Sequence, residues 1–256
     1  MFLRGHIDES YSKRVFTLSC LVGIGSDWVQ FSRAWKRAIE RCNKRLRAKG
    51  RKPIARYHAA DCSNRKNEFS DWTLEEQIEL TAELIDVFKR HEHPVDVTAY
   101  SVNLLDFARV FPEIKPGKNT LRSLYSLLTK FLLIEMGDRY CKQSAVRMAL
   151  IHDRCPYDAV ILSAFNSTIK DPTFRSAKRF TTLVSMSWES CVPLQGADLV
   201  AYENMKEVER RIDGRRRRKS LELLLDLGSF GGRGRTIKPE GLLVIKQVYD
   251  ALKSAE

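Results

Sequence analysis

The first two dozen residues constrain the fold of this 256-residue chain most strongly. Residues 2–7 form a short strand-like run, and residues 14–24 are apolar and rich in β-branched side chains, which is typical of a buried strand. A turn at residues 11–13 would join them. The opening therefore predicts a β-hairpin with the acidic pair Asp8 and Glu9 at the end of its first strand.

The remainder predicts alternating strands and helices. A long amphipathic helix is expected over residues 26–49, with Ser26 as N-cap, Asp27 in its first turn and Gly50 at its end. Further strands are expected at residues 55–59, 95–102, 146–151 and 180–187, and further helices at residues 73–91, 120–141, 193–211 and 239–253, with another opened by Pro156. Residues 58–69 are expected to form a polar loop, and residues 230–235 a flexible loop rich in glycine and arginine.

This order of elements predicts an α/β fold with a mixed sheet flanked by helices. The sequence has no internal repeat and no linker long enough to separate domains. We therefore expect one domain over residues 1–256, with helical insertions and a basic C-terminal extension over about residues 214–256.

The charge balance favours a polyanionic partner. Lysine and arginine number 44 against 32 acidic residues, a net charge of +12, and nucleic acid is the commonest partner for such an excess. The cations gather on the polar face of residues 26–49 and in one consecutive run. That run, predicted to contact nucleic acid, consists of Arg215, Arg216, Arg217, Arg218 and Lys219.

The basic and aromatic residues also suit roles that do not involve nucleic acid. A cationic helix face is often simply solvated, and a short basic run can be a nuclear localisation signal. The four tryptophans can stack on bases, although tryptophan at helical spacing is more typical of a core.

Cysteine usage and the N-terminus favour a cytoplasmic protein. The six cysteines are scattered and form no CxxC pair, which is typical of a reducing compartment and does not suggest a structural zinc site. The N-terminal stretch lacks the apolar core of a signal peptide. No run approaches the roughly 20 apolar residues of a membrane span, so no membrane association is expected. Oligomeric state stays open.

Three aspartates occupy positions where a sheet-based site would need them. Asp8 and Asp153 follow strand-like runs, and Asp198 lies early in a helix that follows a strand. Each alone also fits a simpler local role: a turn, a helix cap, or an acid favoured by the helix dipole. Together they predict a catalytic site, because clustered carboxylates repel one another unless cations such as Mg²⁺ or Mn²⁺ offset their charge.

Several neighbours of these aspartates are candidates for supporting roles. Glu9 alternates with Asp8 and should face the opposite side of the strand, although a bend would let it become a metal ligand. Gln195 lies one helical turn before Asp198, on the same face, where its amide could orient the carboxylate or a water. His58 could move a proton or position a phosphate, with Asp61 close to it in the sequence, although a histidine in a polar loop often has no such task.

Asp158 and His152 lie close to Asp153 in the sequence. Asp158 is an alternative middle ligand, but Asp153 is preferred because it directly follows the apolar strand. His152 should point away from Asp153 along an extended chain, which favours a structural role.

Three segments carry a resemblance to a known family. Asp8-Glu9-Ser10, residues 57–61 (YHAAD) and residues 194–202 (LQGADLVAY) resemble the motifs of the domain of unknown function 3800 family, which shows an N-terminal DES, a middle histidine-containing block and LQxADLxAY. The matches span most of the chain. The resemblance implies a ribonuclease-H-like fold and an acidic, catalytic-looking site. Tyr11 stands where the family often has glycine, which changes the turn rather than the carboxylates.

These observations lead to three hypotheses. The first is a metal-dependent nuclease or related phosphodiester-processing hydrolase using Asp8, Asp153 and Asp198. The alternative is a non-catalytic module that binds nucleic acid or another partner on the same fold. A third is a metal hydrolase acting on a small phosphorylated molecule.

Overall fold

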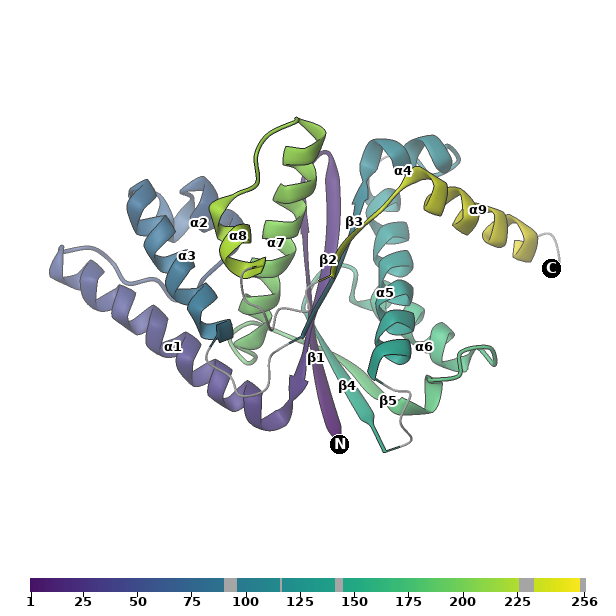
Figure 1. Cartoon of the computed structure of the whole chain (residues 1–256), viewed down its shortest axis with the longest axis horizontal. Helices are drawn as coiled ribbons and strands as arrows, with labels where there is room; N and C mark the ends of the chain where they lie inside the picture. The colour runs from purple at the N-terminus through teal and green to yellow at the C-terminus, as the bar shows by residue number, and fades with distance from the viewer. Residues whose placement is uncertain (90–95, 116, 141–144, 226–232, 254–256) are drawn as a thin grey trace.

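One mixed sheet organises the chain, here in a computed structural model that describes residues 1–89, 96–115, 117–140, 145–225 and 233–253. Within these ranges the strand order is β5-β4-β1-β2-β3-β6 (Figure 1). The strands are β1 (Phe2–Tyr11), β2 (Val15–Ile24), β3 (Asp96–Asn103), β4 (Arg147–Asp153), β5 (Phe180–Met186) and β6 (Arg233–Ile237). Strands β1, β2 and β3 form an antiparallel meander, whereas β4 is parallel to β1, β5 to β4 and β6 to β3.

Helices cover both faces of this sheet (Figure 1). One face carries α1 (Gly25–Ala48), α2 (Ala59–Asn64), α3 (Leu74–Lys89), α7 (Pro193–Ile212) and α8 (Lys219–Leu225). The other carries α4 (Leu104–Val110), α5 (Lys118–Tyr140), α6 (Asp158–Lys170) and α9 (Pro239–Lys253). Short 3₁₀ helices lie at Asn67–Phe69 and Ala177–Arg179. The predicted α/β class and mixed sheet are confirmed.

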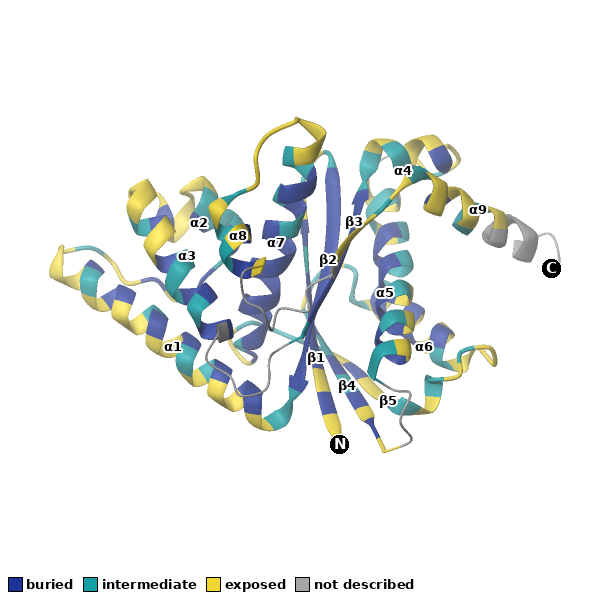
Figure 2. Cartoon of the chain, in the orientation of Figure 1, coloured by how far each residue is buried: buried dark blue, intermediate teal, exposed yellow. Residues whose placement is uncertain are grey.

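Two hydrophobic cores hold the layers together, one on each side of the sheet. Phe31, Trp35 and Leu199 belong to the core under α1 and α7, and Leu128 and Leu132 to the core under α5. Strand β2 is buried almost throughout, as expected for an apolar strand covered on both faces. Figure 2 shows the buried side of α5 turned toward the sheet and its exposed side turned outward, whereas α7 is exposed only at its C-terminal end.

Alternation along β1 decides which side chains can meet the α7 layer. His6 packs edge-on against Trp28 of α1 with 4.3 Å between ring centroids, and Ser10 Oγ lies 3.6 Å from Met205 Sδ on α7. Ile7 lies between these two positions on the alternate face of the strand, and it belongs to the core under α5. Asp8 therefore shares the α7 face, because successive side chains of a strand point to opposite faces.

The strands predicted at residues 14–24, 146–151 and 180–187, and the helices at 193–211 and 239–253, are confirmed to within two residues. The strand predicted at residues 55–59 is wrong, since that stretch is irregular and leads into α2. Side chains of other elements hold this stretch and the residue before it. Gln195 of α7 accepts from the N–H of Tyr57 at 3.0 Å, and Asn43 of α1 both donates to the carbonyl and accepts from the N–H of Ile54, at 2.9 Å each. A strand neighbour is therefore not needed.

Other local predictions need correction. Asp8 does not end the first strand, because pairing with β2 continues to Tyr11 opposite Phe16. Ile24, not Ser26, is the N-cap of α1, and its backbone N–H is bound by Asp27. The helix following Pro156 begins at Asp158. The polar loop predicted at residues 58–69 contains α2 and a 3₁₀ turn.

The C-terminal segment is integrated into the fold. Residues 233–235, predicted as part of a flexible loop, belong to β6, which pairs with β3 at the sheet edge; residues 230–232 of that loop lie outside the described residues. Leu242 of α9 is fully buried in the core under α5. The predicted end of the second helix at residue 91, the start of the strand at Val95, and Cys141 also lie outside the described residues. Along the described chain, no helix is long and apolar enough to cross a membrane.

Candidate functional site

A cavity of about 420 Å³ collects the three predicted aspartates. Asp8 comes from β1, Asp153 from the last position of β4, and Asp198 from the second turn of α7. Glu9, His58 and Gln195 line the same cavity. The structure therefore brings together the aspartates that the sequence separates by up to 190 positions in the chain.

Strand register places the first two aspartates side by side. In the parallel pairing of β1 with β4, Ile7 lies opposite His152, so Asp8 and Asp153 follow as the next residues on their strands. Helix α7 packs across β1 and β2, and Ser19 Oγ of β2 donates to the Ala197 carbonyl at 2.9 Å. This contact holds the start of α7 on the sheet next to Asp8, which lies opposite Ser19 in the pairing of β1 with β2.

The aspartates destabilise one another's ionised forms. Burial raises the pKa of Asp8 well above its ordinary value, and the charges of the neighbouring carboxylates raise it further. Burial also raises the pKa of Asp153. Burial raises the pKa of Asp198 to about 6, although His58 and the backbone N–H of Ala59 oppose this. The cavity therefore holds more negative charge than the chain itself neutralises.

Two side chains of α7 hold the segment that carries His58. Asp198 Oδ2 accepts a hydrogen bond of 2.7 Å from the N–H of Ala59, and Gln195 Oε1 accepts one of 3.0 Å from the N–H of Tyr57. Gln195 Oε1 also accepts from Trp35 Nε1 at 3.1 Å. The sequence predicts that the Gln195 amide orients Asp198 or a water; in the structure its oxygen holds the backbone beside the site.

His58 and Asp61 form a pair next to the carboxylates. His58 Nδ1 lies 2.8 Å from Asp61 Oδ2, and Asn67 donates to the same Asp61 oxygen at 2.9 Å. Hydrogen bonds from Asn67 and His58 lower the pKa of Asp61 despite partial burial. His58 faces the cavity, while Asp61 stands behind it, a suitable arrangement for orienting the imidazole.

Glu9 reaches the cavity from the other side of the sheet. Its carboxylate hydrogen-bonds the hydroxyl of Tyr125 on α5, which agrees with the expected alternation against Asp8. Burial raises the pKa of Glu9, and its hydrogen bonds with Tyr125 and Asp8 offset this rise only in part. Glu9 thus adds a fourth acid at the edge of the cavity.

Arg56 and Trp188 also line the cavity, and sequence reasoning did not select Arg56. The Arg56 guanidinium lies 4.8 Å from the centroid of the Trp188 ring. Trp28, Trp35 and Trp72 are buried as expected of core residues, whereas Trp188 is partly exposed. Its position outside any helical repeat was the available signal, since it lies between β5 and α7.

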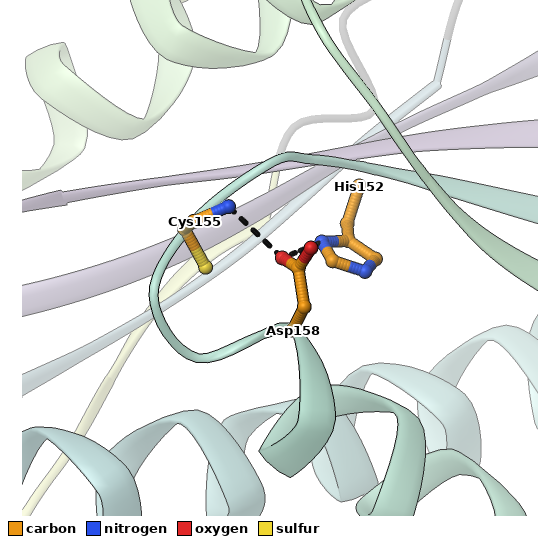
Figure 3. Close-up of side chains that lie close together, drawn as sticks. All are labelled: His152, Cys155 and Asp158. Carbon is orange, nitrogen blue, oxygen red and sulfur yellow. Dashed lines mark hydrogen bonds and ion pairs between the residues drawn. The ribbon is translucent and has the colours of Figure 1, made fainter.

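Asp158 and His152 belong to a separate cluster on the opposite face of β4. Figure 3 shows the Asp158 carboxylate between the His152 ring and the Cys155 backbone. Asp158 accepts from the Cys155 N–H at 2.9 Å and from Ser185 Oγ at 2.8 Å, and His152 Nδ1 lies 2.9 Å from the Asp153 carbonyl.

Potential metal-ligand atoms of this cluster lie within 4.8 Å of one another. However, burial raises the pKa of Cys155 to about 12, which disfavours the thiolate that metals bind. The existing hydrogen bonds explain the cluster as an anchor for the start of α6. Among the two candidates for the middle ligand, Asp153 is the one that faces the cavity.

The predicted basic run is largely engaged within the protein. Arg217 pairs with Glu207 at 3.1 Å and Arg218 with Glu203 at 3.2 Å, and Arg215 pairs with Asp213. Lys219 begins α8. These cations offset acids of α7, which reduces the charge that the run can offer to a phosphate backbone.

The cationic face of α1 divides into two parts. Arg41 and Arg45 pair with Glu83 of α3, at 2.8 and 2.7 Å. A second set of cations is exposed; it comprises Arg33, Lys36, Arg37 and Lys44. This set is the part of the helix that can meet an external polyanion.

In comparisons with known proteins, no family model, no curated protein and no solved structure matches the chain significantly.

Proposed function

We propose that this protein is a Mg²⁺- or Mn²⁺-dependent nuclease, or a related phosphodiester-processing enzyme, of ribonuclease-H-like type. One observation carries the proposal: Asp8, Asp153 and Asp198 converge from β1, β4 and α7 on a single cavity. The mixed sheet with helices on both faces agrees with the ribonuclease-H-like sheet that the resemblance to the domain of unknown function 3800 family implies.

The donor set fits hard divalent cations. The four carboxylates and Arg56 together carry three negative charges when every acid is ionised. Mg²⁺ and Mn²⁺ favour carboxylate oxygens, and their charge removes the mutual repulsion that raises these pKa values. Asp8, Asp153 and Asp198 would hold the ions, with Glu9 as a further ligand at the edge.

Such ions, when bound, supply an activated water and neutralise charge on the phosphate. The chain's own residues have complementary tasks. His58, backed by Asp61, is placed to accept or release a proton at the cavity wall. Gln195 keeps this wall in position through Tyr57, and Arg56 can bind a phosphate oxygen of the substrate.

A cleavage assay tests the proposal. The protein is incubated with single- and double-stranded DNA and RNA in Mn²⁺, Mg²⁺ or EDTA. Asp198→Asn is compared with Asp138→Asn, which removes an exposed carboxylate of α5. We expect metal-dependent products that Asp198→Asn abolishes and Asp138→Asn leaves unchanged. Absence of metal-dependent product on every substrate would contradict the proposal.

The exposed set of cations on α1 favours a second candidate, a nucleic-acid-binding module without turnover. A gel-shift series in rising salt separates the two. Binding that persists in EDTA and in Asp198→Asn, with no cleavage by the wild-type protein, would support this module and exclude the nuclease.

The cavity volume favours a third candidate, a hydrolase of small phosphorylated molecules. About 420 Å³ lies within the range of about 300–1,000 Å³ typical of small-molecule sites. Hydrolysis of a free nucleotide, but of no oligonucleotide, would identify this activity.

A further inference from the structure

Trp188 lines both the carboxylate cavity and a second, smaller hollow. The second hollow has a volume of about 170 Å³ and is also lined by Trp35, Lys36 and Ala55. Trp188 is the aromatic residue that lines both spaces, and Gln195 also borders both. A ligand that extends from the acids over Trp188 would therefore enter the hollow beside α1.

The charges around the hollow suit a neutral group better than a phosphate. Lys36 is opposed there by Glu40 and Glu189. Glu40 is paired with Arg47 at 3.2 Å, and Glu189 lies at the surface. With no excess of positive charge, the hollow offers little to a phosphate, while its indole wall offers a stacking surface to a planar ring.

Its size indicates a part of a ligand rather than a whole one. At about 170 Å³ the hollow is smaller than the range of about 300–1,000 Å³ typical of complete small-molecule sites. A single base fits this description, and a base pair does not.

Arg56 provides the complementary phosphate contact on the other side of Trp188. Among the described residues that line the carboxylate cavity, it is the single lysine or arginine. Its charge lowers the pKa values of Asp153 and Asp198 against the effect of burial, so it lies within electrostatic reach of the proposed reaction site. The Arg56 guanidinium lies over the Trp188 ring, 4.8 Å from its centroid, a distance at which a cation and an aromatic face attract each other.

We propose that Trp188 stacks an unpaired base of a single-stranded nucleic acid in the smaller hollow, while Arg56 holds the adjoining phosphate at the carboxylates. The inference rests on the proposed nuclease function and names its substrate class. A paired base is stacked within its duplex and cannot enter such a hollow without being extruded, which costs free energy. Single strands are therefore the preferred substrate.

Binding measured in EDTA tests this inference apart from catalysis. The probe is a fluorescein-labelled oligothymidylate, followed by anisotropy at low salt, with the same strand in a duplex and a strand of abasic sites as comparisons. The variants are Trp188→Ala, Trp188→Phe and Arg56→Gln. Matched controls are Phe2→Ala, an exposed aromatic at the far end of β1, and Arg109→Gln, an exposed arginine of α4.

We expect Trp188→Ala to weaken single-strand binding by about tenfold or more, as loss of one stacked base does elsewhere. Trp188→Phe should retain most of the affinity, and Arg56→Gln should weaken binding and reduce its salt dependence. Both controls should bind as the wild type does. The wild-type protein should prefer the oligothymidylate to both the duplex and the abasic strand.

Equal affinity of the wild-type protein for abasic and intact strands would overturn the inference, and this comparison needs no variant to fold. Absence of single-strand binding at low salt would overturn it as well. The two proposals fail in different ways. Trp188-dependent binding without metal-dependent cleavage would remove the nuclease and keep the base subsite. Duplex cleavage insensitive to Trp188→Ala would remove the subsite and keep the nuclease.

Discussion

Asp198 accepts a 2.7 Å hydrogen bond from the backbone N–H of Ala59, 139 positions earlier in the chain. This bond joins the segment LQGADLVAY to the segment YHAAD at one point of the site. Gln195, one helical turn before Asp198, holds the Tyr57 N–H in the same way. The start of α7 therefore both carries an acid of the site and fixes the wall that presents His58.

Replacing Asp198 tests whether its carboxylate has a catalytic role or only a structural one. Asp198→Asn keeps the shape and an acceptor for the Ala59 N–H but removes a negative charge from the cavity. We expect metal-dependent cleavage to fall at least about 100-fold while the protein stays folded. Full activity in this variant would exclude Asp198 from the metal site.

The same variant should show a pH-dependent gain in stability. Because the pKa of Asp198 is raised to about 6, ionisation costs the folded state free energy as pH rises from about 4 through about 6. Without metal, Asp198→Asn should therefore melt at a higher temperature than the wild type above about pH 6, and this advantage should vanish near pH 4. Thermal melts in EDTA at both pH values measure the difference.

Gln195 should matter for stability as well as activity. Gln195→Ala leaves the Trp35 Nε1–H and the Tyr57 N–H without their acceptor in a buried place, which costs about 1–3 kcal/mol for an unsatisfied group. Gln195→Glu keeps an acceptor oxygen and should recover part of the loss. Urea unfolding monitored by tryptophan fluorescence measures both; an unchanged midpoint in Gln195→Ala would contradict this role.

Divalent cations should stabilise the folded protein. Binding to the native state alone raises the free energy of unfolding by about 2.7 kcal/mol at a hundredfold excess over Kd. Millimolar Mg²⁺ or Mn²⁺ should therefore raise the melting temperature of the wild type and of Asp138→Asn, and not that of Asp8→Asn. If neither ion shifts the wild-type melt, the acids do not form a metal site.

His6 gives the fold a separate sensitivity to acid. Burial, aided by Arg4, lowers the pKa of His6 to about 3. The unfolded chain takes up this proton near pH 6.5, so the free energy of unfolding falls as pH drops from about 6.5 toward 3, by up to about 1.4 kcal/mol per pH unit. His6→Phe, which keeps a ring against Trp28, should flatten this dependence. Urea unfolding at several pH values tests it, and parallel curves for the two proteins would contradict it.

Gly196 should be required for the close packing of α7 against α1 and the sheet. A Cβ at this position would lie 2.8 Å from Phe31 Cζ and 3.2 Å from Leu21 Cδ1, so Gly196→Ala should cost about 1–3 kcal/mol through overpacking. Gly25→Ala is the matched control, because a Cβ there meets nothing within 4 Å. Comparable stability of the two variants in urea would show that α7 can move away from the sheet at no cost.

The sequence by itself determined the elements that carry the aspartates. The strands that carry Asp8 and Asp153 and the helix opened by Pro193 were predictable, because periodicity and helix-start signals are local properties of the chain. The same local alternation predicted that Glu9 and His152 point away from Asp8 and Asp153. The three aspartates could therefore be selected together from the sequence, two by their places on strands and Asp198 by its place near the start of a helix.

The tertiary structure alone decided what surrounds these acids. Residues 55–59 looked like a strand, yet side chains of α7 bind the N–H groups of Tyr57 and Ala59, and Glu68 binds that of Ala55, which no local pattern reveals. The Arg56–Trp188 contact likewise joins positions 132 residues apart. The basic run at 215–219 looked available for nucleic acid, but Glu203 and Glu207, spaced one turn apart on α7, engage two of its arginines. Local propensity decides which element a residue enters, whereas contacts between distant elements decide which charges and backbone groups remain for a ligand.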